Sequence, residues 1–459
     1  MHTCLLNDSE TKKIRTRETI VNQLIMEIEI LSRETIKPSS PTPSDLRIYP
    51  LSFIDNAFYR KYVPVIFFYN TNEVSNQTSK VSQLRNSLSH VLSKYYHFAG
   101  RLKDKTTIEC NDQGVSFFIT KIQNNLSEIV QNPTEESVNS LFPDELQWKV
   151  MDWSGSLFVI QVHCFACGGI AISILMTHKV GDGTTLFKFL NDWAIINQKL
   201  EQEDLSILLS PLSLQEGGAS IFSQRDIPIF PELFIPGGNN IVYKRFVFEA
   251  SKIKSLKEKV RNSLNFSPTR VQVVSALIYK RAVTTKGLNF KIAPFTTVVD
   301  VRRRMVPPLS ENYVGNIVWF ASMCPDKEKM ELDELVSKIK QALSEFCEVY
   351  PKKFEGKEEE DLSFISGCLE HLNDGYYENH NMYTFSSWCG FPVYDVDFGW
   401  GKPTWVTTFG CLMKNVIFMM DARDGEGIEV FVSMKKNDMD KFENDVEILQ
   451  YASLNPSNV

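Results

Sequence analysis

Residues 157–198 read LFVIQVHCFACGGIAISILMTHKVGDGTTLFKFLNDWAIINQ, and this stretch decides the fold. Two runs of β-branched and aliphatic residues, 157–165 and 170–177, flank Gly168-Gly169, and this pattern predicts two strands joined by a tight turn. From residue 186 onward, apolar side chains recur at helical spacing and predict an amphipathic helix. His178 is thus expected where a buried strand gives way to a loop before a helix, a place where scaffolds often present reactive side chains.

His178 is the first candidate for catalysis. An imidazole with an ordinary pKa of about 6.5 is largely neutral near pH 7 and can accept a proton from a hydroxyl or an amine. Among the seven histidines, only His178 is followed four residues later by an aspartate, Asp182. Asp182 could orient the imidazole, or it could cap the following helix. By itself, a histidine in such a short motif is more often a hydrogen-bonded core residue than a base.

A second motif lies near the other end of the chain. Residues 394–403 read YDVDFGWGKP, which contains the string DFGWG. HxxxDG at 178–183 together with DFGWG at 397–401 resembles the BAHD family of plant acyl-CoA-dependent acyltransferases, and the resemblance covers the chain from Met26 onward. Further segments, IKPSSPTP, ECNDQGV, FACGG and VGNI, resemble the branch of the family that acetylates alkaloid hydroxyls.

The alternation of strands and helices in both halves predicts an α/β architecture. The resemblance implies two similar domains of mixed β-sheet with flanking helices, like chloramphenicol acetyltransferase, and a solvent channel between them with His178 midway. The domains are expected at 26–205 and 241–459, joined by a linker at 206–240 that is rich in Pro, Gly and Ser. Residues 398–423 are expected to cross back to the first domain, and residues 1–25 to be a disordered extension.

The resemblance also implies the mechanism. His178 would be a general base that takes the proton of an alcohol as it attacks the acyl-CoA thioester in a ternary complex, with Asp182 as its partner or as a structural brace. Structural roles are implied for Asp397, which would pair with Arg302, and for the tight turn formed by Gly399, Trp400 and Gly401.

Residues for binding coenzyme A are also carried over from the family by position. They are Ser275, Tyr313, Asn316, Ser386, Ser387 and Trp388. Each could equally be an ordinary core or turn residue, because short matches of this kind are only hypotheses.

Cys164-x-x-Cys167 offers two alternative functions. One is a cysteine nucleophile, which would give ping-pong kinetics, and the other is a metal or redox pair. The sequence holds no second CxxC, and the pair adjoins an alternating strand. Buried thiols are therefore the simpler interpretation, and no metal is expected.

Length and composition limit the class of protein. A chain of 459 residues, 43% hydrophobic and 23% charged, fits a globular protein of two domains, and its net charge of −7 argues against nucleic acid as a partner. No apolar run reaches the length of a membrane span, and the nine irregularly spaced cysteines fit a reducing cytosol. We therefore expect a cytoplasmic protein without a permanently bound cofactor, and the resemblance implies a monomer.

The substrates are less constrained. The resemblance favours acetyl-CoA as donor and a bulky alkaloid alcohol as acceptor. A malonyl donor would need a nearby cation such as Arg423, and N-acylation of an amine would use the same base. A relative that binds a ligand without turnover is a further alternative, against which the intact His178 argues. A separate structural expectation is a helix over 326–350 that ends at Pro351.

Overall fold

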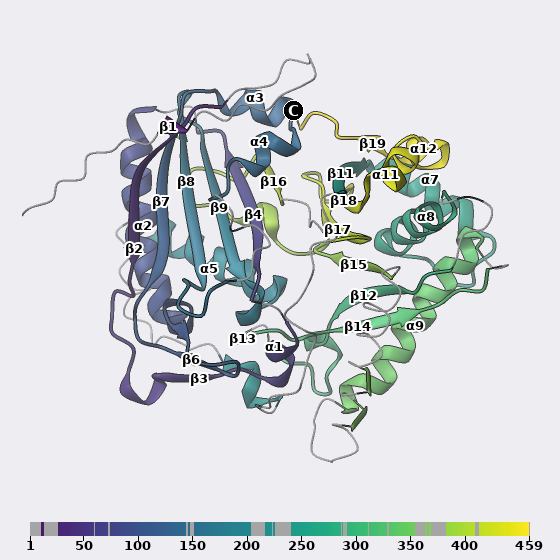
Figure 1. The fold of residues 1–459 in the computed structure, drawn as a ribbon, viewed down its shortest axis with the longest axis horizontal. Coiled ribbons are helices and arrows are strands. Elements are labelled where there is room, and N and C mark those ends of the chain that lie inside the picture. Colours follow the sequence, from purple (N-terminus) through teal and green to yellow (C-terminus); the bar gives the residue numbers. More distant parts are fainter. Residues whose placement is uncertain are drawn as a thin grey trace, which may run out of the picture.

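The computed structural model describes residues 11–12, 26–58, 60–71, 74–143, 146, 151–202, 216–222, 224, 240–285, 287, 292–310, 312–327, 330–353, 363–364, 367–368, 382–408 and 413–458. Two mixed β-sheets lie side by side, each with flanking helices (Figure 1). The α/β fold with two mixed-sheet domains is therefore confirmed. Within the described part of the chain, no helix is both long enough and apolar enough to cross a membrane.

The first sheet and its helices form what we call the first half. Its strand order is β1-β2-β7-β8-β9-β4-β16, in which β7 and β8 are parallel and the other neighbours antiparallel. The strands are β1 (Thr11–Lys12), β2 (Ile28–Ile36), β4 (Tyr62–Tyr69), β7 (Val115–Ile122), β8 (Phe158–Phe165), β9 (Ile170–Thr177) and β16 (Trp405–Thr407). Helices α2 (Gln77–Lys94) and α5 (Gly183–Glu201) pack together, and the Trp193 indole donates to the Ser87 hydroxyl at 2.9 Å.

The second sheet and its helices form the second half. Its order is β14-β12-β15-β17-β18-β11-β19, with β15 parallel to both neighbours. The strands are β11 (Ile241–Phe248), β12 (Phe295–Asp300), β14 (Val318–Met323), β15 (Tyr383–Ser387), β17 (Val416–Asp421), β18 (Ile428–Lys435) and β19 (Ser453–Leu454). The helices are α7 (Ala250–Arg261), α8 (Arg270–Thr284), α9 (Leu332–Lys353), α11 (Lys436–Phe442) and α12 (Val446–Tyr451). Figure 1 shows α8 and α9 on the side of this sheet away from the first half.

Shorter elements complete the fold and carry parts of the site. They are β3 (Ile48–Pro50), β5 (Arg101–Leu102), β6 (Thr107–Glu109), β10 (Glu216–Gly217), β13 (Tyr313–Val314), α1 (Phe53–Ala57), α3 (Leu126–Gln131) and α4 (Glu135–Asn139). In Figure 1, α1 and β13 lie at the lower end of the boundary between the halves.

The predicted strands and helices beside His178 agree with the structure, but two other expectations are wrong. Residues 398–423 do not all return to the first sheet, because β16 pairs with β4 whereas β17 lies between β15 and β18 in the second sheet. Pro351 does not stop α9, which continues to Lys353. Pro351 lacks the N–H that would donate to the carbonyl four residues earlier, but only Lys352 and Lys353 follow it, so the break affects only the end of the helix.

Two expectations fall largely outside the described residues. In the expected extension, residues 1–25, only 11–12 are described, and they form β1 beside β2. In the expected linker, residues 206–240, the described 216–222 include β10, which pairs in parallel with β13.

Candidate active site

His178 lies at the end of β9, in a single 3-10 turn (His178–Val180) that precedes α5. Its backbone N–H donates to the Lys61 carbonyl at 2.8 Å, and its ring stacks on Phe58 with centroids 4.4 Å apart. The side chain is only partly buried, unlike the eight residues of β9 before it. The imidazole is therefore fixed in position yet still accessible.

The partner of the imidazole is Asn316, from the second half. His178 Nδ1 and Asn316 Oδ1 are 3.0 Å apart, and Asn316 Nδ2 donates to the His178 carbonyl at 2.8 Å. Because the Asn316 amide oxygen can only accept, Nδ1 must carry the proton, and Nε2 is left with a free lone pair. Burial lowers the pKa of His178, while the charge of Asp182 and the hydrogen bond that Nδ1 donates to Asn316 act in the opposite direction. The site therefore presents a neutral imidazole that can take a proton.

Asp55, on α1, holds Asn316 in turn. One carboxylate oxygen accepts from the Asn316 backbone N–H at 2.6 Å and from Nδ2 at 3.0 Å, and the other accepts from the Ser52 N–H and hydroxyl at 2.9 and 2.7 Å. Burial raises the pKa of Asp55, and these four donors oppose the rise. Sequence reasoning did not assign Asp55 a function, although the S-x-x-D spacing from Ser52 is a capping-box signal that could have drawn attention to it.

Asp182 does not contact the imidazole as a hydrogen-bond partner. Its carboxylate caps α5 by accepting from the Thr185 N–H at 2.9 Å, and it forms an ion pair with Arg302 of the second half at 2.7 Å. Both side chains are at most 2% exposed. Although burial alone would raise the pKa of Asp182, the Arg302 guanidinium brings it below its ordinary value. Asp182 therefore ties the two halves together beside His178.

The predicted pairing of Asp397 with Arg302 is wrong. Arg302 gives its guanidinium donors to Asp182 and to the Tyr313 and Gly315 carbonyls. Asp397 instead accepts from the backbone N–H groups of Gly399 and Gly401 at 2.8 and 2.9 Å.

The Asp397 hydrogen bonds close a tight turn in which both glycines have φ near +101°, a conformation that favours glycine. The turn presents Trp400 to Tyr69 of β4, with ring centroids 6.1 Å apart. The Phe398 carbonyl accepts from Asn197 near the C-terminal end of α5, so the DFGWG motif lies at the end of α5 opposite to His178.

The positions expected to bind coenzyme A lie in three places. Ser386, Ser387 and Trp388 stand together at the end of β15, and the Trp388 ring packs against Phe187 of α5 with centroids 5.5 Å apart. Ser275 is only 2% exposed, and its hydroxyl donates to the Met419 sulfur at 3.5 Å. Tyr313 gives its carbonyl to Arg302, and Asn316 is the imidazole's partner.

A basic cavity of about 970 Å³ opens on the second half. Its charged lining residues are four cations, Lys254, Lys257, Arg261 and Arg270, and two carboxylates, Glu258 and Glu426. Arg270 pairs with Asp421 at 3.0 Å, and the other Asp421 oxygen accepts from the Gly390 N–H at 2.7 Å. The cavity is therefore linked to the segment that carries Trp388.

The cysteine pair lies at the other end of the hairpin. Cys164 pairs with Ile170, eight residues before His178, which corresponds to about 26 Å of extended chain. Burial raises the pKa of Cys164 to about 11, which disfavours the thiolate that a nucleophile needs. Among the described residues, no group of three or more His, Cys, Asp or Glu side chains could hold a metal ion.

Comparison with known proteins gives consistent matches over almost the whole chain. The model of the Transferase family matches residues 26–449. Akuammiline synthase 1 of Alstonia scholaris is 38% identical, over 93% of this chain and 98% of the relative. A 17,18-epoxy-17-hydroxycur-19-ene N-malonyltransferase of Strychnos nux-vomica is 36% identical, over 93% of this chain and 91% of the relative. The crystal structure of vinorine synthase superposes with a TM-score of 0.77 at 30% identity, covering 94% of this chain and 100% of that one.

Proposed function

Because the chain belongs to the Transferase family, the BAHD acyl-CoA-dependent acyltransferases, we propose that it transfers an acetyl group from acetyl-CoA to a hydroxyl of a plant alkaloid. The observation that carries this proposal is the neutral imidazole of His178, held through Nδ1 by Asn316 so that Nε2 is free. A general base is the group that an alcohol needs to attack a thioester directly.

The reaction follows from this geometry. Nε2 of His178 takes the hydroxyl proton while the alcohol oxygen bonds to the thioester carbonyl carbon. The tetrahedral intermediate then collapses, the carbon–sulfur bond breaks, and the imidazolium returns the proton to the departing thiolate. The products are the ester and free coenzyme A. Cys164 and Cys167 lie too far from His178 to act in this chemistry, so the proposed route is a ternary complex without an acyl-enzyme.

The basic cavity is the proposed seat of the coenzyme A phosphates. Its four cations suit the polyanionic end of coenzyme A, since phosphates are held by lysine and arginine side chains. From there, Ser386, Ser387 and Trp388 would line the way of the pantetheine arm toward His178. Tyr313 and Asn316 lie at the His178 end, where they position the site. Ser275 is left out of this group, because its hydroxyl is buried and already donates to Met419.

A second candidate is malonyl transfer to an amine, which the Strychnos relative's name describes for that protein. The same base would serve an amine, and a malonyl carboxylate would need a cation. Arg423, in the exposed turn after β17, is the cation that the sequence offered for this purpose. The seven described cysteines are free, which supports a cytoplasmic location, and we propose that the protein acts as a monomer.

The test is a two-donor assay. Wild-type protein would be incubated with acetyl-CoA or malonyl-CoA and a panel of alkaloid alcohols and amines, and both free thiol and product mass would be followed. We expect ester formation with acetyl-CoA and intersecting initial-velocity patterns, which indicate a ternary complex. Parallel initial-velocity patterns would contradict the ternary complex and indicate an acyl-enzyme. Products formed only with malonyl-CoA and amines would favour the second candidate, malonyl transfer to an amine.

A further inference from the structure

The connection between the two halves contains a segment, residues 216–222, that packs beside the candidate active site, and we call it the connecting segment. Its strand β10 pairs in parallel with β13, which sets Gly217 opposite Val314. Val314 lies two residues before Asn316, whose amide is the partner of the His178 imidazole. The connecting segment is therefore paired with the same stretch of the second half that supplies the partner of the imidazole.

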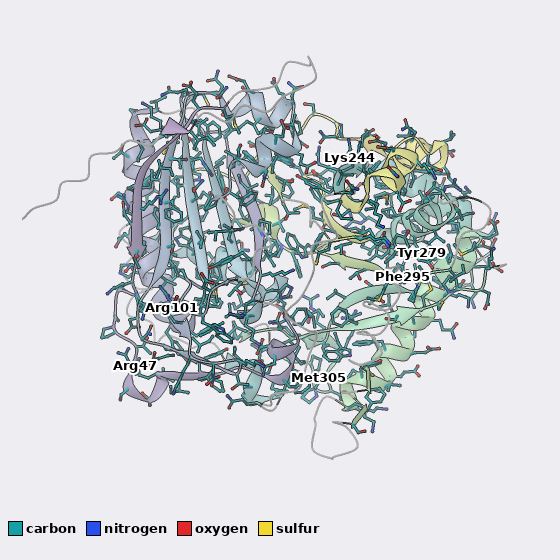
Figure 2. All side chains as sticks on the ribbon, in the orientation of Figure 1. Arg47, Arg101, Lys244, Tyr279, Phe295 and Met305 are labelled. Atoms are coloured by element: carbon teal, nitrogen blue, oxygen red, sulfur yellow. The ribbon has the colours of Figure 1, made fainter. Side chains whose placement is uncertain are left out.

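Phe222 anchors the connecting segment at its other end. It is fully buried and packs edge-to-face on Phe53 of α1, with ring centroids 6.1 Å apart. Phe53 lies two residues before Asp55 in the same helix. Both phenylalanines belong to a buried apolar cluster that also contains Ile317, the residue after the partner of the imidazole. Figure 2 shows another member of this cluster, Met305, at the lower end of the boundary between the halves.

The backbone of the connecting segment lies in close contact with the residues around Asp55. A Cβ atom added at Gly217 would lie only 2.7 Å from the Tyr49 hydroxyl, closer than real Cβ atoms come to a neighbour. A Cβ atom added at Gly218 would lie 3.5 Å from the Ser52 hydroxyl and 3.8 Å from Asp55 Oδ2, which are ordinary contacts. Position 217 therefore requires glycine for this packing, whereas position 218 has room for a methyl group.

The layer beneath the connecting segment is shielded from water. Asp55 is 1% exposed and Asn316 is fully buried. The Tyr49 hydroxyl is buried without a hydrogen-bond partner among the described residues, and burial together with the charge of Asp55 raises the pKa of Tyr49. Hydrogen bonds are stronger where no water competes for them. By packing against this layer, the connecting segment helps to keep water away from the hydrogen bonds between Asp55 and Asn316.

We propose that the connecting segment is a positioning element for the base: Gly217 and Phe222 hold it against the layer around Asp55, and Asp55 holds the Asn316 amide that orients the imidazole of His178. The inference rests on the proposed function, because it gives this segment a part in orienting the base of that reaction.

Displacement of the segment would have a specific consequence. Water would reach the Asp55 carboxylate and compete for its hydrogen bonds, so that the Asn316 amide could turn. The imidazole would then lose the acceptor that keeps the proton on Nδ1, and both neutral tautomers of His178 would be populated.

The test compares two pairs of matched variants in the full-length protein. Phe222→Leu removes the ring that packs on Phe53. Its control is Phe246→Leu, because Phe246 is also buried and packs edge-to-face on Phe442, with centroids 5.4 Å apart, between β11 and α11. Gly217→Ala is compared with Gly218→Ala, which adds the same methyl group at a position with room for it.

Three properties would be measured for each variant. NMR of protein with isotope-labelled histidine nitrogens reports the tautomer of His178, whose signals are those that disappear in His178→Ala. Steady-state kinetics gives kcat and the KM for acetyl-CoA, and thermal unfolding shows that the variants are folded.

We expect wild type, Gly218→Ala and Phe246→Leu to hold His178 with the proton on Nδ1. Phe222→Leu and Gly217→Ala should show both tautomers, and kcat should fall about 10-fold, within what a displaced reacting group can cost, while the KM for acetyl-CoA is unchanged. Phe246→Leu should lower the unfolding temperature without either effect.

An unchanged tautomer in Phe222→Leu and Gly217→Ala, or an equal loss of kcat in Phe246→Leu, would overturn the inference. The NMR measurement needs no substrate, so it separates the two proposals. A tautomer that responds to Phe222→Leu in a protein without acetyl transfer would count against the reaction alone, whereas full activity in all four variants would count against the positioning element alone.

Discussion

At the scale of single residues, the site depends on a chain of three polar groups. The imidazole of His178 is held by the amide of Asn316, which is held by the carboxylate of Asp55. The aspartate of the HxxxD motif stands outside this chain, in an ion pair with Arg302. An amide in place of a carboxylate keeps the imidazole oriented without placing a negative charge against it, which is consistent with a base of lowered pKa.

Asn316→Ala tests the orienting role. Without the Oδ1 acceptor, the ring can rotate and adopt either tautomer, so kcat should fall about 10-fold to 100-fold while the KM for acetyl-CoA changes little. Steady-state kinetics with a thiol reagent would measure both. Asn316→Gln offers a conservative comparison that keeps the amide, because an aspartate would place a second carboxylate against Asp55. An Asn316→Ala enzyme with wild-type kcat would rule out the orienting role.

The pH profile follows from the state of the same base. The reaction requires a neutral imidazole, and burial lowers the pKa of His178. As the pH is lowered, kcat/KM should therefore begin to fall only below about 6.5, the pKa of an ordinary histidine. The rate should therefore be constant from pH 7 upward until other groups titrate. A fall in kcat/KM centred above pH 7 would contradict a neutral base with a lowered pKa.

His97 gives a residue-scale prediction about stability. It is fully buried, neither ring nitrogen has a hydrogen-bond partner among the described residues, and burial lowers its pKa to about 3. Between pH 6.5 and 3 the unfolded chain binds a proton at His97 that the folded chain does not bind. As the pH is lowered through this range, the free energy of unfolding should therefore fall by up to about 1.4 kcal/mol per pH unit. In His97→Phe, the free energy of unfolding should depend less on pH in this range, because the contribution of His97 is absent. Denaturant titrations at pH 7 and pH 5 would show it, and equal pH dependence in both proteins would exclude the effect.

At the scale of elements, the sequence predicted what local pattern determines. Strands β8 and β9, the turn between them and helix α5 follow from hydrophobic periodicity and from glycine. Asn316 and Asp55 are hydrogen-bonded although they are 261 positions apart in the sequence, and His178 and Asn316 are 138 positions apart. No local sequence pattern could predict these contacts. The error at Asp397 has the same origin, because choosing between two carboxylates for Arg302 requires the tertiary structure. The three residues of β16 are too few to show a period.

The ion pair between the start of α5 and the turn after β12 yields a prediction for elements. Asp182 and Arg302 are almost completely buried, and removing one partner of such a pair leaves an uncompensated charge. Arg302→Met should therefore lower the free energy of unfolding by about 3–5 kcal/mol and reduce activity by displacing Asp182 and Asn316. Denaturant unfolding followed by tryptophan fluorescence would measure the loss. A loss well below 1 kcal/mol would show that the pair is not a structural tie.

At the scale of the whole molecule, the two halves share one reaction centre. The base comes from the first half, whereas its partner Asn316 and the arginine that holds Asp182 come from the second. One cavity lies between the halves and is lined by residues of both, and another, with two lysines and two arginines in its lining, opens on the second half. This arrangement is suited to bringing two substrates to one imidazole at the same time.

The most direct measurement of the central claim is the rate of coenzyme A release by His178→Ala, compared with wild type at saturating acetyl-CoA and an alcohol that wild type acetylates. Circular dichroism and thermal unfolding would first establish that the variant is folded. If His178 is the base, release should fall at least about 100-fold while the affinity for acetyl-CoA is retained. A folded His178→Ala protein that releases coenzyme A at the wild-type rate would contradict the account.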